Sequence, residues 1–213
     1  MPYRQTLASG IIIAPTLPEH AEELEELQRV VFPDLADDER FKAPHYRKHM
    51  ELFPEGQFVA LDGEQVVGTT TAIRQSFDFD HPHHRFIDVI DGGWLTSHDP
   101  QGEWLYGMDI GTHPDYRRRG IARALYAARH DTVRRLGLRG QVTVGMLNGY
   151  HRYRDEMTID EYFTKVKAGE ISDPTVSTQQ SVGFEIRVLV KDYLDDPTCG
   201  NAGALIVWPA ERD

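Results

Sequence analysis

The stretch HPDYRRRGIARALYAARHDTVRRLGLRG, residues 113–140, contains the feature that decides the fold. Its apolar residues recur at helical spacing over 120–136, and Gly137 follows as a residue well suited to end a helix. Three consecutive arginines, residues 117–119, stand just before the first turn. The start of a helix is its positive end and disfavours cations, so this arrangement predicts an anionic partner at the turn.

The loop before this helix has the features of an anion-binding site. A strand that leads through a glycine-containing loop to a helix N-terminus brings free backbone N–H groups and the helix dipole together. Gly120 and the small Ala122 allow a bulky phosphate to approach the backbone, and the arginines add charged donors. The alternative is a solvated arginine cluster that pairs with acids such as Asp115.

The composition limits the class of protein. With 213 residues, 40% of them hydrophobic and 27% charged, the chain is expected to form one domain over 1–213 with a loop insertion at about 78–103. No apolar run is long enough to span a bilayer, and the net charge of −11 argues against nonspecific nucleic-acid binding. A single cysteine, Cys199, allows no internal disulfide, which favours the cytoplasm.

Several familiar enzyme classes lack their motifs here. The sequence contains neither a G-x-x-x-x-G-K-[ST] loop nor a strand-linked G-x-G-x-x-G, which excludes a P-loop nucleotidase and a dinucleotide dehydrogenase. It also lacks a G-x-S-x-G elbow, and Cys199 lies in a turn-rich segment rather than at a helix start. Nucleophilic hydrolysis is therefore not expected.

The pattern of apolar and turn residues predicts a mixed α/β domain built on one sheet. Helices are expected from Pro18 to Phe32 and from 38 to 52, followed by a hairpin around Asp62-Gly63. Further along, the expected elements are a strand at 104–113, the helix at 120–136, a strand at 141–147, helices within 157–170 and 173–183, and strands at 184–194 and 202–210.

These residues resemble the GCN5-related N-acetyltransferase (GNAT) superfamily. Arg117-x-x-Gly120-x-Ala122 is similar to its [QR]-x-x-G-x-[GA] pyrophosphate loop, and the order of elements agrees over nearly the whole chain. Gly183-Phe184 resembles the G-F pair that opens a late strand in many members. Residues 149–157, 173–186 and 204–209 look more particularly like GNAT domains that precede nitrilase-type domains in some bacterial proteins. The resemblance implies a single mixed, mostly antiparallel sheet flanked by helices.

The resemblance also implies a function, transfer of an acetyl group from acetyl-CoA to a primary amine by direct attack in a ternary complex. The acceptor would be a small molecule or a peptide, and a homodimer is compatible with the family. The alternative is a noncatalytic module that binds acyl-CoA as a sensor or regulator. The residues that the resemblance assigns to acetyl-CoA are Ile110, Gly111, Thr112, Arg117, Arg118, Arg119, Gly120, Ile121 and Ala122.

The chain departs from the family at the acid for the leaving thiolate. Many members have a tyrosine four residues before the glycine of the G-F pair, and this position holds Gln179, whose amide cannot serve as an acid. The nearest substitutes in sequence are Tyr150, His151 and Tyr153. Both tyrosines are equally compatible with packing beneath the next helix, and His151 with a solvent-facing loop.

Asp109 is the best candidate for the base, because it lies in the strand that family members often use for it. Burial of its face would raise the pKa of the carboxyl group and let it accept a proton near neutral pH. On an exposed face, Asp109 would be a solvated residue or a partner of Arg117. Deprotonation through water, without any single base, also stays open.

The segment 78–103 contains Asp78, Asp80, His81, His83 and His84. These residue types bind metals, but the H-x-H-H spacing matches no helix face and no zinc signature, so no metal site is expected. The segment is either a surface insertion or a loop that faces substrate.

Overall fold

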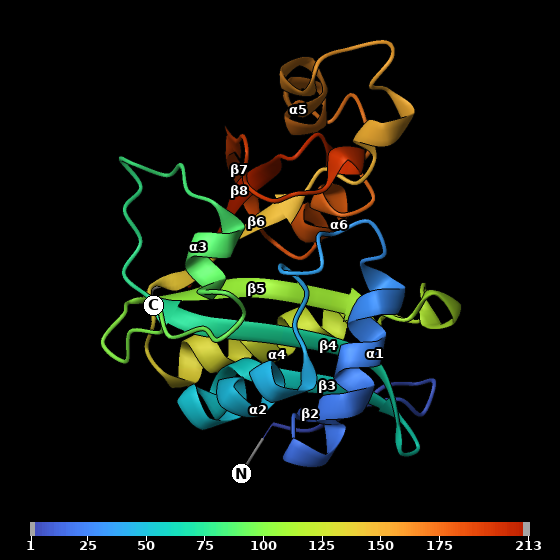
Figure 1. The fold of residues 1–213 in the computed structure, drawn as a ribbon, viewed down its shortest axis with the longest axis vertical. Coiled ribbons are helices and arrows are strands. Elements are labelled where there is room, and N and C mark those ends of the chain that lie inside the picture. Colours follow the sequence, from blue (N-terminus) through green and yellow to red (C-terminus); the bar gives the residue numbers. More distant parts are fainter. Residues whose placement is uncertain (1–2, 211–213) are drawn as a thin grey trace.

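The computed structural model describes residues 3–210, which form one eight-stranded sheet with helices on both faces (Figure 1). The strand order is β1-β2-β3-β4-β5-β6-β8-β7, and every neighbouring pair is antiparallel except β5 and β6. The strands are β1 (Gln5–Thr6), β2 (Ile12–Pro15), β3 (Gln57–Asp62), β4 (Gln65–Gln75), β5 (Trp104–Thr112), β6 (Gly140–Met146), β7 (Glu185–Val190) and β8 (Gly203–Pro209). The predicted mixed, mostly antiparallel sheet is confirmed.

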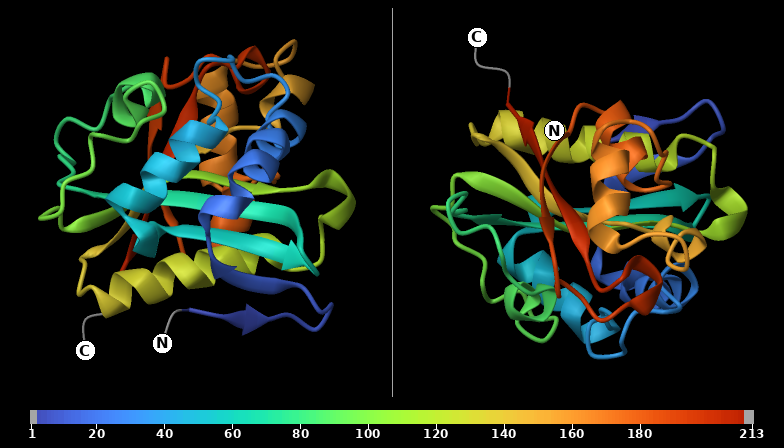
Figure 2. Two further views of the ribbon diagram at one scale, coloured as in Figure 1. Left: turned by 60° about the horizontal axis from the view of Figure 1, so that its bottom comes forward. Right: turned by 90° about the horizontal axis from the view of Figure 1, so that it is seen from above.

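The α-helices are α1 (Ala21–Val31), α2 (Ala43–Leu52), α3 (Phe86–Ile90), α4 (Ile121–Arg135), α5 (Ile159–Lys167) and α6 (Val176–Ser181). Helices α1 and α2 lie on one face of the sheet and α4 on the other (Figure 2). The predicted apolar stripe of α4 is buried, as at Leu125 and Val133, which are fully covered. Gly137 follows the helix with a φ of 62°, the left-handed conformation that the sequence predicted for it.

Three details of the sequence-based prediction were wrong. The second helix begins at Ala43 rather than at 38, because the side chain of Arg40 binds backbone carbonyls at 32 and 33 and holds the preceding residues in a loop. The hairpin turn is Gly63-Glu64, since Asp62 still pairs with Gln65. Strands β1 and β2 were not predicted, because a four-residue apolar run gives too short a pattern to separate a strand from a loop.

A β-bulge interrupts the pairing of β4 with β5. Thr71 pairs with Asp109 and Ala72 pairs with Gly107, so Met108 has no partner on β4. Arg129 of α4, only 1% exposed, donates to the Thr71 carbonyl at 2.7 Å and to the Asp109 carbonyl. A buried guanidinium therefore satisfies backbone acceptors beside the bulge and fixes the position of Asp109.

Gly107 makes room for this arginine. A Cβ atom at position 107 would lie 2.2 Å from Nη1 of Arg129, which is far inside van der Waals contact. The glycine is therefore required by the close approach of a side chain from α4, and not by an unusual backbone angle.

Acid is expected to destabilise the fold through two buried histidines. His49 donates from Nε2 to the Gly93 carbonyl at 2.6 Å, and His130 stacks on Trp208 with ring centroids 3.8 Å apart. Burial lowers the pKa of each ring to about 4 from 6.5, so the unfolded chain binds more protons between these pH values. The free energy of unfolding in urea should therefore fall by about 2 kcal/mol per ring from pH 7 to pH 5.

A matched pair of variants tests this assignment. His49→Gln should reduce the loss of stability on acidification, whereas His83→Gln, at an exposed ring that forms no ion pair within residues 3–210, should leave it unchanged. An equal free energy of unfolding at both pH values in the unmodified protein would contradict the effect.

Candidate active site

An opening separates β5 from β6 beyond the middle of the sheet. The two parallel strands pair from Trp104 with Gly140 to Gly107 with Thr143, and β5 then continues to Thr112 without pairing with β6. The bulge lies where the pairing ends. In a strand, alternate N–H groups point to alternate neighbours, so some N–H groups of 108–112 point into the opening.

A long groove runs along this opening and past the start of α4. It spans about 2560 Å³, including space open to solvent. Of the residues predicted to contact acetyl-CoA, those that line the groove are Ile110, Thr112, Arg117, Arg118, Gly120, Ile121 and Ala122. His151 lines it as well, together with Arg152 and Arg154.

The loop at the start of α4 is shaped for an anion. Arg118 and Gly120 have φ of 63° and 81°, which turns successive backbone N–H groups toward one side, as in an anion-binding nest. A left-handed arginine costs about 1–3 kcal/mol, which favours a functional reason for the strain. Gly120 caps α4 without a side-chain hydrogen bond, and the first turn contains no acid.

The arginines of this loop differ in their contacts. Within residues 3–210, Arg117 and Arg118 form no ion pair. Arg119 donates to the Asp115 carbonyl at 3.2 Å, and its guanidinium lies 4.7 Å from the centre of the Tyr116 ring. A pyrophosphate fits this loop, because the loop offers two arginines without ion pairs, a nest of backbone N–H groups and the N-terminus of α4. From there the groove continues toward the β5–β6 opening.

Four residues predicted for the site do not line the groove: Asp109, which lines the inner cavity next to it, and Gly111, Arg119 and Tyr150. Arg119 folds over Tyr116 instead, and Gly111 faces Val31 of α1. Tyr150 donates from its hydroxyl to the Met157 carbonyl at 3.3 Å. The short 3-10 turn that contains Tyr150 and His151 therefore directs the tyrosine inward and the histidine to the groove.

An inner cavity of about 680 Å³, partly open, continues from the groove on the side of α1 and α2. Six residues line both spaces: Phe32, Ile110, Met146, Asn148, Thr175 and Gln179. The walls of the cavity are mostly apolar and include Leu35, Phe41, Phe86 and Tyr193. Because Phe86 belongs to the segment 78–103, part of that segment faces the cavity.

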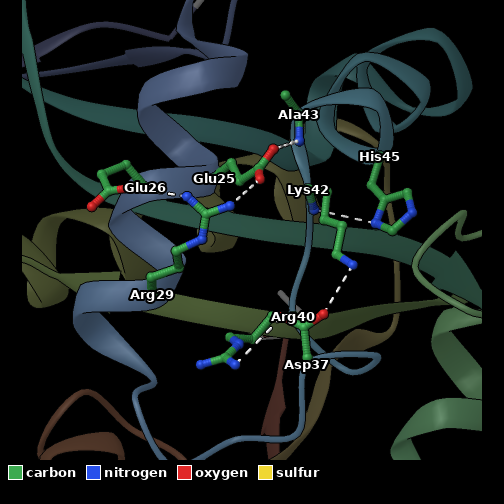
Figure 3. Close-up of polar contacts among 8 residues, drawn as sticks. All are labelled: Glu25, Glu26, Arg29, Asp37, Arg40, Lys42, Ala43 and His45. Carbon is green, nitrogen blue, oxygen red and sulfur yellow. Dashed lines mark hydrogen bonds and ion pairs between the residues drawn. The ribbon is translucent and has the colours of Figure 1, made fainter.

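The loop between α1 and α2 forms one wall of the cavity, and polar contacts hold it in place (Figure 3). Glu25 accepts from the Ala43 N–H at 2.8 Å and so caps the start of α2, where the helix dipole favours an anion. Asp37 pairs with Lys42 at 3.1 Å and with Arg40 at 3.5 Å. These contacts fix the backbone around Leu35, Glu39 and Phe41, which line the cavity.

Asp109 lines the inner cavity and is anchored on both oxygens. Oδ1 accepts from the Thr71 N–H at 2.8 Å, and Oδ2 accepts from Gln28 Nε2 at 2.5 Å. Burial raises the pKa of this carboxyl group, and the nearby Arg129 cation and the hydrogen bonds from Thr71 and Gln28 oppose the rise. No contact joins Asp109 to Arg117 among the described residues.

A second buried carboxyl group lines the same cavity. Glu39 is 6% exposed and accepts from the Asp195 N–H at 2.9 Å. Burial raises its pKa too, and the neighbouring acids Asp38, Asp195 and Asp196 add to the rise.

Gln179 of α6 lies at the junction of the groove and the inner cavity. It is 4% exposed and donates from Nε2 to the hydroxyl of Tyr126 on α4 at 2.8 Å. Gly145 of β6 leaves space for it, since a Cβ there would lie 2.1 Å from Oε1 of Gln179. Tyr126 also lines the groove. In the sequence it looks like an ordinary core residue of an amphipathic helix, so no local pattern marks it as a site residue.

Two further features bear on the class of protein. Within residues 3–210, no three His, Cys, Asp or Glu side chains lie close enough together to hold a metal ion. Among the helices of the same residues, none combines the length and apolar character needed to cross a membrane.

A mixed sheet that opens between two parallel strands, with a loop shaped for an anion at the start of the following helix, supports the class of proteins that bind acyl-CoA. The profile of the acetyltransferase (GNAT) family matches residues 21–152, and the chain belongs to this family. Membership of this family supports acyl transfer from an acyl-CoA donor.

Two relatives from Bacillus subtilis (strain 168) are similar in sequence. The uncharacterized N-acetyltransferase YkwB is 30% identical over 188 residues, covering 88% of this chain and 83% of YkwB. The probable hydrolase YhcX is 37% identical over 184 residues, covering 86% of this chain. The match covers 35% of YhcX, so the chain spans about a third of that relative's length.

The solved structure of the GphF GNAT-like decarboxylase in complex with isobutyryl-CoA superimposes with a TM-score of 0.80. It is 20% identical, and the match covers 93% of this chain and 99% of the other. This likeness supports the fold alone. The narrower resemblance to nitrilase-associated GNAT domains stays a prediction.

Proposed function

We propose that the protein transfers an acetyl group from acetyl-CoA to a primary amine by direct attack in a ternary complex. The observation that carries the proposal is Asp109, a carboxylate with a raised pKa in a cavity continuous with the groove. An acyl-CoA in the groove and an amine in the cavity would meet beside it.

On the donor side, the pyrophosphate lies against the N–H groups of the loop at 118–122, with Arg117 and Arg118 adding charged donors. The thioester enters the β5–β6 opening. There, N–H groups of 108–112 that have no β6 partner stabilise the carbonyl oxygen as it gains negative charge.

On the acceptor side, Asp109 takes a proton from the amine as its nitrogen attacks the thioester carbonyl carbon. The raised pKa suits this role, because burial disfavours the carboxylate and makes it a better proton acceptor. Glu39 places a second acid in the cavity and attracts the amine as an ammonium ion, which releases one proton to solvent before the neutral nitrogen attacks. Phe41 and Phe86 favour an apolar substituent on the amine. These walls support a small amine with an apolar group as acceptor.

The alternative is a noncatalytic acyl-CoA-binding module, and the feature that favours it is Gln179 at the usual position of the acid. Both functions require the same groove and differ in turnover. A single cysteine, buried at Cys199, supports a cytoplasmic location for either.

Calorimetric titration with acetyl-CoA, and with dephosphorylated pantetheine as a control, tests the donor site. We expect acetyl-CoA to bind and pantetheine to bind at least about tenfold more weakly, because it lacks the pyrophosphate. Equal affinity for the two compounds would contradict the assignment of the loop. Release of free thiol with a panel of primary amines then distinguishes the transferase from the noncatalytic module.

A further inference from the structure

The leaving thiolate needs a proton donor, and Gln179 cannot supply one. The junction of the groove and the inner cavity is where a thioester would lie, with its pantetheine arm in the groove and its acyl group toward the cavity. Tyr126 lines the groove, and its hydroxyl lies 2.8 Å from Nε2 of Gln179, which lines both spaces. The tyrosine hydroxyl therefore lies at this junction.

We infer that Tyr126 of α4 donates the proton to the departing thiolate of coenzyme A, and that Gln179 of α6 holds the tyrosine in position. This inference rests on the proposed function. In the family, the usual tyrosine comes from the helix that corresponds to α6, which here contains Gln179. In this chain, the hydroxyl of Tyr126 reaches the same junction from α4.

The contacts of Tyr126 leave its proton available. Because the amide of Gln179 donates to the phenolic oxygen, the O–H bond of Tyr126 is free to point elsewhere. The ring is held by an edge contact with Phe184 at 5.3 Å between centroids, and the Arg129 guanidinium lies 5.8 Å from the ring centre. Both the amide N–H and the cation stabilise the phenolate that remains after transfer.

The protonation state fits a donor. Burial raises the pKa of Tyr126 above 10, while the Arg129 cation and the Gln179 hydrogen bond act in the opposite direction. The hydroxyl is therefore protonated at neutral pH and ready to donate.

The step balances without another reactant. The amine nitrogen forms a bond to the carbonyl carbon and loses its proton to Asp109. The C–S bond breaks, its electron pair goes to sulfur, and Tyr126 protonates that sulfur. Solvent then returns a proton to the tyrosine through the open groove and takes up the proton from Asp109, so both residues regain their starting state.

The geometry of Gly145 explains why a glutamine can hold this position. Its missing side chain leaves the space that Oε1 of Gln179 occupies against β6. Gly145→Ala is expected to displace the amide from Tyr126. Gly145→Ala alone should lower kcat by about fivefold. In the Tyr126→Phe background, adding Gly145→Ala should change kcat little, because the hydroxyl that Gln179 positions is already absent.

The test compares Tyr126→Phe with Tyr162→Phe, a control that removes a buried hydroxyl outside the groove, where it donates to Asp173 at 2.9 Å. Thiol release is measured with acetyl-CoA and a panel of phenethylamine, putrescine and glycine amide. We expect Tyr126→Phe to lower kcat about thirtyfold and to leave the acetyl-CoA dissociation constant within twofold. The expected fall in kcat is no larger, because water that enters the open groove can protonate the thiolate in place of Tyr126.

The outcomes separate the two proposals. Unchanged kcat in Tyr126→Phe, or a loss of similar size in Tyr150→Phe, overturns the assignment of Tyr126 while amine acetylation stands. A weakened acetyl-CoA affinity with unchanged kcat also overturns it, since a binding role alone would cause that pattern. Absence of thiol release by the unmodified protein with every amine overturns the proposed function, and with it this inference.

Discussion

Asp109→Asn is expected to lower kcat by about a thousandfold and to leave the affinity for acetyl-CoA within twofold, because proton removal by a positioned base contributes rate rather than donor binding. The asparagine can still accept from the Thr71 N–H through Oδ1, so the bulge keeps its shape. Its amide cannot take a proton from the amine. Steady-state thiol release and calorimetry on the same preparation measure the two quantities.

The pH profile gives this variant a second readout. A base with a raised pKa acts only when ionised, so kcat/KM of the unmodified protein should rise with pH through the pKa of Asp109 and again at higher pH, where the free amine loses its proton. Asp109→Asn should lose the first rise and keep the second. Turnover equal to that of the unmodified protein across neutral pH would remove Asp109 as the base and favour deprotonation through water.

Glu39→Gln is the matched control, because it neutralises a buried carboxyl group in the same cavity. The glutamine keeps an oxygen that can accept from the Asp195 N–H. Since Glu39 attracts the amine rather than accepting its proton, the change should raise KM for the amine and leave kcat within about threefold.

The sequence was sufficient to predict the elements whose patterns are long. The stripe of α4 and the hairpin of β3 and β4 both depend on residues close together in the chain. The anion loop was predictable for the same reason, since Arg117, Gly120 and Ala122 are neighbours. Local patterns therefore identified the donor side of the site.

The acceptor side depends on contacts that no local pattern contains. In the sequence, Arg129 looks like one more solvated arginine of a basic helix, yet it binds the Thr71 carbonyl 58 residues away. The bulge at Met108 depends on how β4 aligns with β5. Tyr126 and Gln179, 53 residues apart, meet only because α4 and α6 flank the same opening. These residues became candidates once the fold brought them together.

Arg118→Glu is expected to weaken acetyl-CoA binding about a hundredfold, or about 2.7 kcal/mol. The arginine lines the groove, forms no ion pair within residues 3–210, and lies in a strained left-handed conformation beside Gly120. The change removes a charged donor to the pyrophosphate and adds a repelling charge at the positive end of α4. Calorimetric titration at low and moderate salt measures the loss, which should shrink as salt screens the repulsion.

Arg119→Glu is the control for this result, because it makes the same change of charge one residue further along the chain. The Arg119 side chain lies over the Tyr116 ring and donates to the Asp115 carbonyl, and it does not line the groove. Arg119→Glu should weaken acetyl-CoA binding by less than about fivefold, because only the long-range repulsion between the new carboxylate and the phosphates acts on the ligand. Equal losses in the two variants would mean that net charge near the helix start, and not the direction of one guanidinium, holds the phosphates.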